Sequence, residues 1–197
     1  MRLCATKIPT PSVLDEDIIH RHSRLRIGIV SRLRRPFSSD RFFFITCCLA
    51  KNHPRLENPD FHLLVDSIQK AKEKHHFLLT AWVFLPDHWH AIFFPSSPLT
   101  ISMLMETIKV RSTHRINQLR QARGSLWQPR FFDHAIRTIE RYHHFVDYIH
   151  MNPVRRDLVR RPEDWAWSSI HSYIKQETPL LTIDMLNLPL DPKARLF

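Results

Sequence analysis

The sequence predicts an α+β domain in which an antiparallel sheet carries helices packed on one face. Aromatic and β-branched runs, which are typical of buried strands, alternate with longer segments that have the period of an amphipathic helix. Their order along the chain is strand, helix, strand, strand, helix, strand, helix. This order fits an antiparallel sheet with helices packed against it.

The first half of the chain contributes a strand, a helix and two further strands. Residues 41–50, RFFFITCCLA, predict a buried strand. The next helix begins at Asn58 and Pro59, a favourable pair for a helix start. Its apolar residues recur at helical spacing, at Phe61, Leu64, Val65 and Ile68. The segments FLLTAWVFLP and HWHAIFFP then predict two strands, separated by the turn pair Pro86-Asp87.

The second half contributes a long helix, a strand and a last helix. Helical spacing runs from about residue 100 to residue 123, and Gly124 supplies a stop signal. The segment SLWQPRFFDHAIR is strand-like, with an interruption at Pro129. The last helix is predicted from about residue 139 to residue 151, because Pro153 disfavours its continuation.

The domain organisation follows from these elements. With 197 residues, 43% of them hydrophobic, the chain can build one sizeable core, which we place in residues 41–173. Residues 1–40 form a basic arm that contains RHSRLRIGIVSRLRRP. This arm is either a disordered tail or a nucleic-acid clamp that orders on binding. Residues 174–197 form a C-terminal tail about which the sequence says little.

The charge of the chain favours a polyanionic partner. Lys and Arg number 29 against 19 Asp and Glu, which gives a formal net charge of +10. Nucleic acid is a better candidate than a membrane surface, and a merely basic soluble protein is the alternative. The chain holds no apolar run of about 20 residues, so no segment is predicted to span a bilayer, and we expect no membrane partner.

The glycine and cysteine residues exclude several classes of protein. Gly28 and Gly124 are the only glycines, which excludes the G-x-G-x-x-G and P-loop motifs. Cys4, Cys47 and Cys48 are odd in number and lack C-x-x-C spacing, which indicates a reducing compartment without a disulfide or zinc-finger framework. Any phosphate chemistry must therefore use a metal ion, basic side chains or helix ends.

The segment LPDHWHAIF places two histidines two residues apart in a predicted strand. Residues i and i+2 of a strand lie on the same face, so His88 and His90 could bind one ion while Trp89 points into the core. The motif alone is a weak signal, because a chain with 14 histidines contains H-x-H spacings by chance.

The last predicted helix carries a candidate nucleophile and a third ligand. At 100° per residue Tyr142 falls on the apolar stripe, whereas Tyr148 falls on its flank, where a side chain can be held by packing and still reach solvent. Asn152 lies one turn further on the same flank. If this helix packs beside the strand, His88, His90 and Asn152 form a three-ligand site that suits Mg²⁺ or Mn²⁺.

The chemistry explains why these residue types belong together. A tyrosine hydroxyl has an ordinary pKa near 10 and is a weak nucleophile at neutral pH. A divalent ion on the scissile phosphate would stabilise the added charge, and attack by Tyr148 would leave a covalent phosphotyrosine. The aromatic side chains Trp127 and Trp165 could stack unpaired bases, although core packing is the more ordinary role for each.

Four segments in order, LPDHWHAIF, WQPRFFDHAIR, YIHMNPVRRDLV and DWAWSS, resemble the successive blocks of the REP-associated tyrosine transposases. These are single-tyrosine transposases with a histidine–hydrophobe–histidine motif. The resemblance runs from about residue 24 to residue 173. It implies a ferredoxin-like α+β domain in a bacterial, cytoplasmic and nucleoid-associated protein that binds single-stranded DNA with hairpin-forming palindromic repeats.

The resemblance also implies an activity and the residues that perform it. Members of the family cut such DNA with a divalent metal ion, form a 5′-phosphotyrosine and free a 3′-OH. Tyr148 matches the nucleophile, and His88, His90 and Asn152 match the metal ligands, with Mg²⁺ or Mn²⁺ as cofactor. Related enzymes can work as dimers, so the chain is expected to be a monomer or a homodimer.

Basic residues in and around these blocks are the candidate DNA contacts. The RLRIGIVSRLRRP stretch resembles the DNA-contacting N-terminal segment of the family, although it matches less well than the four blocks. The candidates are Arg24, Arg26, Arg32, Arg34, Arg35, Lys109, Arg111, Arg115, Arg130, Arg155 and Arg156.

Two other functions remain open on the sequence. The same fold could bind DNA hairpins without productive cleavage, or the chain could be an unrelated zinc or RNA protein that uses scattered histidines. Covalent adduct formation at Tyr148 separates the enzyme from the binding module, and tightly held zinc away from His88 and His90 would indicate the third function.

Overall fold

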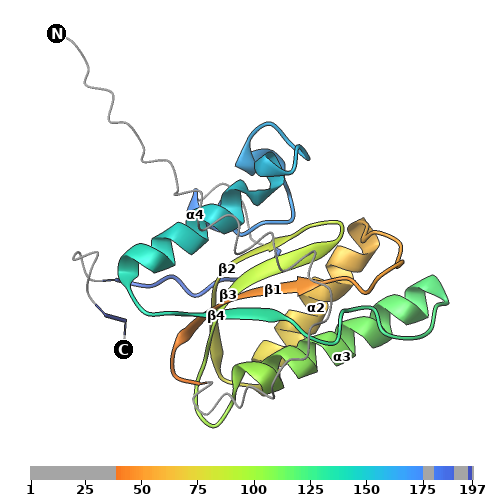
Figure 1. Cartoon of the computed structure of the whole chain (residues 1–197), viewed down its shortest axis with the longest axis horizontal. Helices are drawn as coiled ribbons and strands as arrows, with labels where there is room; N and C mark the ends of the chain where they lie inside the picture. The colour runs from red at the N-terminus through yellow and green to blue at the C-terminus, as the bar shows by residue number, and fades with distance from the viewer. Residues whose placement is uncertain (1–38, 175–179, 189–194, 197) are drawn as a thin grey trace, which may run out of the picture. The chain divides into compact units, whose positions relative to one another are not determined.

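The sheet has four strands in the order β2-β3-β1-β4, and every neighbouring pair is antiparallel. In the computed structural model, residues 39–174, 180–188 and 195–196 are described. Along the chain the elements are β1 (Phe42–Cys48), α2 (Asn58–Lys74), β2 (Phe77–Phe84), β3 (His88–Pro95), α3 (Ile101–Arg120), β4 (Phe132–Ile136) and α4 (Ile139–Arg155), followed by the short helices η1 (Pro162–Asp164) and α5 (Ile170–Tyr173) (Figure 1). The basic arm, residues 1–38, lies outside the described residues.

The element order confirms the predicted fold class. From β1 to β4 the order is β-α-β-β-α-β, which is the ferredoxin-like arrangement. Each predicted strand and helix is present, and the turn at Pro86-Asp87 separates β2 from β3 as expected. The class is therefore α+β with a single antiparallel sheet.

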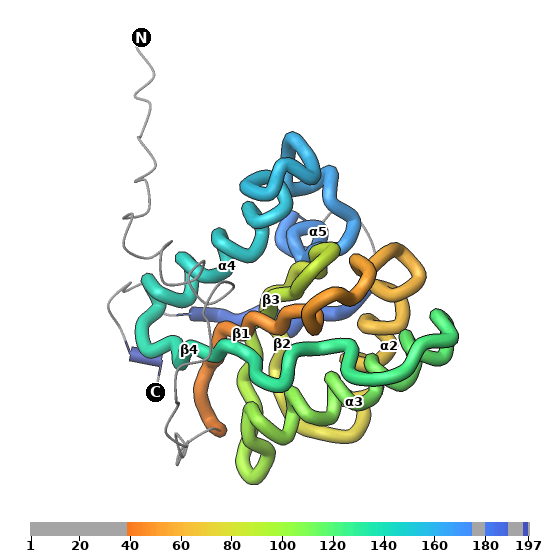
Figure 2. The backbone as a smooth tube through the Cα atoms, turned by 45° about the vertical axis from the view of Figure 1, so that its right-hand side comes forward, coloured from red at the N-terminus to blue at the C-terminus, as the bar shows by residue number. Residues whose placement is uncertain are grey.

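The helices differ from the prediction in one respect, because they cover both faces of the sheet. Helices α2 and α3 pack together on one face, and α4 lies on the other, as Figure 2 shows. In β1, Ile45 belongs to the core beneath α2 and α3, whereas the ring of its neighbour Phe44 stacks on Phe145 of α4 with centroids 4.4 Å apart. Both faces of β1 are apolar, so both must be covered. The prediction of helices on one face is right for α2 and α3 and wrong for α4.

Three helix ends differ by a few residues from the sequence prediction. Helix α2 is capped by Glu57 rather than Asn58, and the Glu57 N–H donates to the Asp60 carboxylate at 2.8 Å. Helix α3 ends at Arg120, and the left-handed cap residue that follows it is Gln121, three positions before Gly124. Pro153 lies inside the last turn of α4. Near a helix end the missing N–H removes a single bond, so the helix continues to Arg155.

Later parts of the chain cover the exposed edge of β2. The Phe84 N–H donates to the Trp167 carbonyl at 2.9 Å, and the Leu79 N–H donates to the Asp184 carboxylate at 2.9 Å. Leu181 and Ile183 are buried in the core. Such cover protects the backbone groups of an edge strand from pairing with another chain. The described part of the predicted C-terminal tail thus includes a segment that packs on the domain.

Among the described residues, no helix has both the length and the apolar composition needed to cross a bilayer.

Candidate metal and nucleophile site

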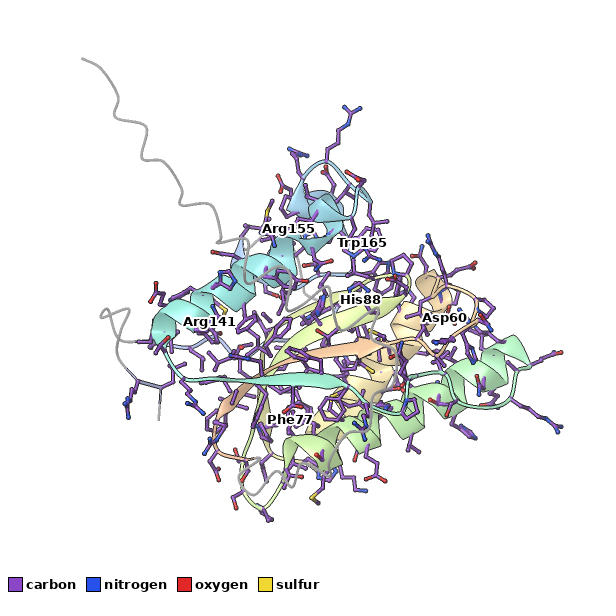
Figure 3. All side chains as sticks on the ribbon, in the orientation of Figure 1. Asp60, Phe77, His88, Arg141, Arg155 and Trp165 are labelled. Carbon is purple, nitrogen blue, oxygen red and sulfur yellow. The ribbon has the colours of Figure 1, made fainter. Side chains whose placement is uncertain are left out.

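Strand β3 and helix α4 are adjacent, and they bring the four predicted site residues together. His90 pairs across the sheet with Thr46 of β1, and both side chains point to the α4 face. The Asn152 amide nitrogen lies 3.3 Å from His90 Nε2, and the rings of His90 and Tyr148 have centroids 5.3 Å apart. In Figure 3, His88 lies at the end of the sheet beneath the part of α4 that carries Arg155.

The two imidazoles point their Nε2 atoms at each other. His88 Nε2 and His90 Nε2 are 3.1 Å apart, and the rings are nearly perpendicular, at 79°. Two nitrogens bound at right angles to one ion, each about 2.1 Å from it, lie about 3.0 Å apart. The spacing of the nitrogens therefore suits joint binding of one divalent ion.

The other nitrogen of each imidazole is held from behind. His88 Nδ1 donates to the Asp87 carboxylate at 2.6 Å, because an ionised carboxylate can only accept. His90 Nδ1 lies 2.9 Å from the Thr46 hydroxyl. For His88 this fixes the tautomer in which Nε2 carries a lone pair. Metal-binding histidines are usually held in this way by a carboxylate or another polar group.

The environment of the histidines is charged on one side and apolar on the other. Burial alone would raise the pKa of Asp87, but its hydrogen bond to His88 and the charged Arg156 guanidinium hold that pKa well below its ordinary value. Burial lowers the pKa of His90 well below its ordinary value, and the neighbouring His88 adds to the shift. A neutral imidazole keeps the lone pair that a metal ion needs.

Asn152 completes the donor set. Its side chain is buried, and its Oδ1 atom has no hydrogen-bond partner among the described residues. A half-turn of the amide would exchange Oδ1 with Nδ2, and Oδ1 would then face His90 Nε2. A buried carbonyl oxygen without a partner is costly unless something binds it. This oxygen and the two lone-pair nitrogens fit a hard divalent ion.

Tyr148 is more buried than the sequence suggested. Its side chain is 5% exposed, whereas a flank position was expected to reach solvent. The ring makes edge contacts with Phe44 and His90, with centroids 5.7 and 5.3 Å away. The Arg155 guanidinium lies 5.4 Å from the ring centroid. Tyr148 is thus held against the histidine pair by α4 and by the Phe44 ring.

The other two tyrosines of the chain are placed differently. Tyr142 is buried as predicted, and burial raises its pKa. The Tyr173 hydroxyl donates to the Thr80 carbonyl at 2.9 Å, and burial again raises its pKa. The Tyr148 ring, in contrast, lies against His90 with centroids 5.3 Å apart, so Tyr148 is the best placed of the three to act beside the histidine pair.

The side chain of His150 points away from the site, as its position on α4 predicts. It is buried, and its Nε2 lies 2.8 Å from the Ser169 hydroxyl. The same hydroxyl accepts from the Trp82 N–H at 2.9 Å, so His150 ties α4 to the edge of the sheet. Trp127 is also a core residue, 2% exposed, and donates to the Ser112 hydroxyl. The predicted core role is confirmed for Trp127.

The candidate DNA-contacting residues separate into three groups. Lys109 of α3 donates to the carbonyls of Gln128 and Pro129, and Arg111 and Arg115 both pair with Asp66 of α2 at 3.1 Å. These three lie on the helices opposite the site. Exposed positions just before β4 and at the end of α4 hold Arg130, Arg155 and Arg156. The arm residues lie outside the described residues: Arg24, Arg26, Arg32, Arg34 and Arg35.

Sequence reasoning missed two residues that build the site. The sequence pattern predicts only a turn at Asp87 and only a strand at Thr46, yet these two side chains hold the rear nitrogens of the histidines. The signal for Asp87 was present, since an aspartate directly before the first histidine can reach its Nδ1. Thr46 gave no signal, because its contact depends on the register between β1 and β3.

A ferredoxin-like sheet with a histidine pair on a central strand and a tyrosine on the covering helix defines the class of single-tyrosine transposases. The family model described as transposase IS200-like matches residues 41–152, which include the histidine pair, Tyr148 and Asn152. The chain belongs to this family.

Within the family, the relatives found are REP-associated tyrosine transposases. The one from Escherichia coli (strain K12) is 34% identical over 143 residues, which cover 72% of this chain and 84% of that protein. A putative one from Haemophilus influenzae is 25% identical over 158 residues, which cover 75% and 90%. A solved structure of a REP-associated tyrosine transposase bound to a REP hairpin matches with a TM-score of 0.66 at 30% identity, over 85% of this chain and 99% of that chain. The resemblance read from the sequence is confirmed, and the interpretation as an unrelated zinc or RNA protein is wrong.

Proposed function

We propose that this chain is an enzyme that cuts and rejoins single-stranded DNA at hairpin-forming palindromic repeats, with Mg²⁺ or Mn²⁺ as cofactor. The observation that carries the proposal is the convergence of His88 Nε2, His90 Nε2 and the Asn152 amide beside Tyr148. The hairpin as partner is supported by the related transposase that was solved with a REP hairpin. The net charge of +10 suits a polyanion.

The residues of the chain have distinct roles in the proposed reaction. The Tyr148 hydroxyl oxygen attacks the phosphorus, a new Oη–P bond forms, and the bond from phosphorus to the 3′-oxygen breaks. The hydroxyl proton passes to solvent and the leaving 3′-oxygen takes up a proton, which gives a 5′-phosphotyrosine and a free 3′-OH. Arg155, whose guanidinium lies over the ring, favours the developing phenolate. His88, His90 and Asn152 would hold a divalent ion that stabilises charge on the phosphate.

The packing also supports action within one chain. Tyr148 contacts His90 of the same chain, so a monomer can assemble nucleophile and ligands together. A homodimer would have to bring the helix of one chain to the sheet of the other to act in trans. A DNA-processing monomer of this kind is expected to work at the nucleoid in the bacterial cytoplasm.

The proposal is tested with a hairpin single strand that is labelled at its 3′ end, because the 3′ fragment is the one that stays on the tyrosine, and that is incubated with Mg²⁺ or Mn²⁺. We expect cleavage and a covalent protein–DNA band that resists denaturation. The Tyr148→Phe variant keeps the ring contacts but lacks the nucleophilic oxygen, so both products should fall by at least about a thousandfold. Hairpin binding with no adduct from the unaltered protein would identify the alternative function, a binding module of the same fold.

A further inference from the structure

We propose that Asp87 and Arg156 are positioning residues that lock His88 in its metal-binding orientation, a role that rests on the metal site of the proposed function. Arg156 was expected to contact DNA, but its side chain is directed to the turn between β2 and β3. The two residues form a chain of hydrogen bonds from the protein surface to the first histidine.

The Asp87 carboxylate uses one oxygen for each partner. Its Oδ1 atom accepts from His88 Nδ1 at 2.6 Å, and its Oδ2 atom accepts from the Arg156 guanidinium at 2.6 Å. Charge-assisted hydrogen bonds of this length are strong and directional. A carboxylate fixed at both oxygens cannot rotate away from the imidazole, so His88 keeps its proton on Nδ1 and its Nε2 lone pair towards His90.

Arg156 also joins the two elements that supply the ligands. Its backbone N–H donates to the Asn152 carbonyl at 3.0 Å at the end of α4, while its side chain holds the turn that precedes β3. The turn itself is fixed, because the Leu49 N–H donates to the Asp87 carbonyl at 2.9 Å. Arg156 therefore links the helix that carries Asn152 to the turn before His88.

Arg156 and its neighbour Arg155 have different surroundings. Arg155 lies over the Tyr148 ring, where it can act on the nucleophile or on a phosphate. The Arg156 side chain is 38% exposed, yet its guanidinium is paired with a carboxylate that the site needs. We therefore expect loss of Arg156 to weaken metal binding more than hairpin binding.

The first experiment reads the tautomer of His88 without metal. Long-range ¹H–¹⁵N spectra of the ¹⁵N-histidine-labelled protein should show His88 with its proton on Nδ1, with the signal assigned by its loss in His88→Gln. In Asp87→Ala the Nδ1 proton has lost its acceptor, and we expect a shift to the Nε2–H form or a mixture. An Nδ1–H form that persists unchanged in a folded Asp87→Ala variant overturns the role of Asp87.

The second experiment measures Mn²⁺ affinity by calorimetry, together with hairpin affinity. Loss of the hydrogen-bond partner behind a metal-binding histidine lowers the affinity for the metal by about 10–100-fold. We expect Asp87→Ala and Arg156→Gln to fall in this range, with Arg156→Lys restoring most of the affinity and with hairpin affinity changed less than about threefold. Arg156 is at the surface, so Arg156→Gln should fold even if Asp87→Ala does not.

The matched control is Arg161→Gln. Arg161 pairs with Asp164 at 2.8 Å in an exposed loop after α4, so this variant removes the same charge and the same kind of ion pair away from the site. It should bind Mn²⁺ like the unaltered protein. Equal Mn²⁺ affinity in Arg156→Gln and Arg161→Gln overturns the role of Arg156.

The two proposals can fail separately. If the unaltered protein binds no Mn²⁺, or if His90→Ala binds it equally well, the proposed metal site is wrong, and the metal-free spectra still decide whether Asp87 fixes His88. If His90→Ala loses Mn²⁺ while Asp87→Ala and Arg156→Gln do not, the metal site stands and the positioning role is wrong.

Discussion

The two faces of the sheet differ in what they bury. Towards α2 and α3 the strands present side chains such as Ile45 and Trp89, which join one apolar core. Towards α4 the same strands present Phe44 and His90, which contact Tyr148, and Thr46, which contacts His90. Because the side chains of a strand alternate between its two faces, adjacent residues in the sequence have different roles. One face is therefore an apolar core, and the other holds a polar site between the sheet and α4.

The segment HWH shows this division within three residues. Trp89 is fully buried in the core beneath α2 and α3, while His88 and His90 on either side of it point to α4. Trp89 anchors the strand, because burial of its large ring in the core fixes which side of the strand faces α2 and α3. The histidines are buried too, 8% and 1% exposed, but by the helix that carries their partner Asn152.

The largest expected effect comes from removing a ligand on the site face. His90→Ala should lower the Mn²⁺ affinity by more than about 100-fold and should abolish cleavage. This effect is larger than the one expected for losing a hydrogen-bond partner of a ligand. Chelation of the metal from the unaltered protein should have the same effect on cleavage and should leave hairpin binding intact. Calorimetry and the adduct assay measure both. Full cleavage in excess chelator contradicts the account.

A pair of neighbouring variants in β1 sharpens the comparison between faces. Phe44→Leu and Ile45→Val each remove a little apolar contact, and each should lower the free energy of unfolding by about 1 kcal/mol. Only Phe44→Leu should also slow adduct formation, by about tenfold, because Phe44 stacks on His90 and braces Tyr148. Denaturant unfolding and adduct kinetics separate the two outcomes. Equal slowing by Ile45→Val would show that the faces are not independent.

The smallest effects are expected at Arg111, Arg115 and Arg155. Arg111 and Arg115 pair with Asp66 on the opposite face, so replacing both by Gln should change hairpin affinity by less than about twofold and stability by less than about 1 kcal/mol. Arg155→Gln should lower the hairpin affinity several-fold. It should also reduce the slope of log K against log salt concentration by about 0.7, because one phosphate contact is lost. Binding measured across a salt series tests this. A larger loss from the Arg111 and Arg115 pair would place DNA on the α2 and α3 face.

Much of this fold could be predicted because its signals are local. The aromatic run of β1, the helical spacing of α2 and the Pro86-Asp87 turn each depend on a few adjacent residues, and all three are present in the structure. The inward orientation of the Trp89 side chain and the burial of Tyr142 follow from periodicity alone. The same reasoning brought His88, His90, Tyr148 and Asn152 together, and the roles assigned to them stay predictions.

The remainder depends on contacts between distant segments. Nothing in the period of α4 says which face of the sheet it covers, and the burial of Tyr148 follows from that choice. The contact of Thr46 with His90 requires the register of two strands that are 44 residues apart. Arg156 reads as a DNA contact in a basic stretch, and only the folded turn shows its bond to Asp87. Tertiary geometry decides these points.

The most direct test of the account is the site of the covalent adduct. The chain has three tyrosines, and Tyr148 is the one whose ring lies against His90, with centroids 5.3 Å apart. After incubation with a hairpin single strand and Mn²⁺, nuclease trimming and mass spectrometry of proteolytic peptides should place the residual nucleotide on Tyr148 alone. An adduct on Tyr142 or Tyr173, or no adduct under conditions in which the DNA is cut, would contradict the account.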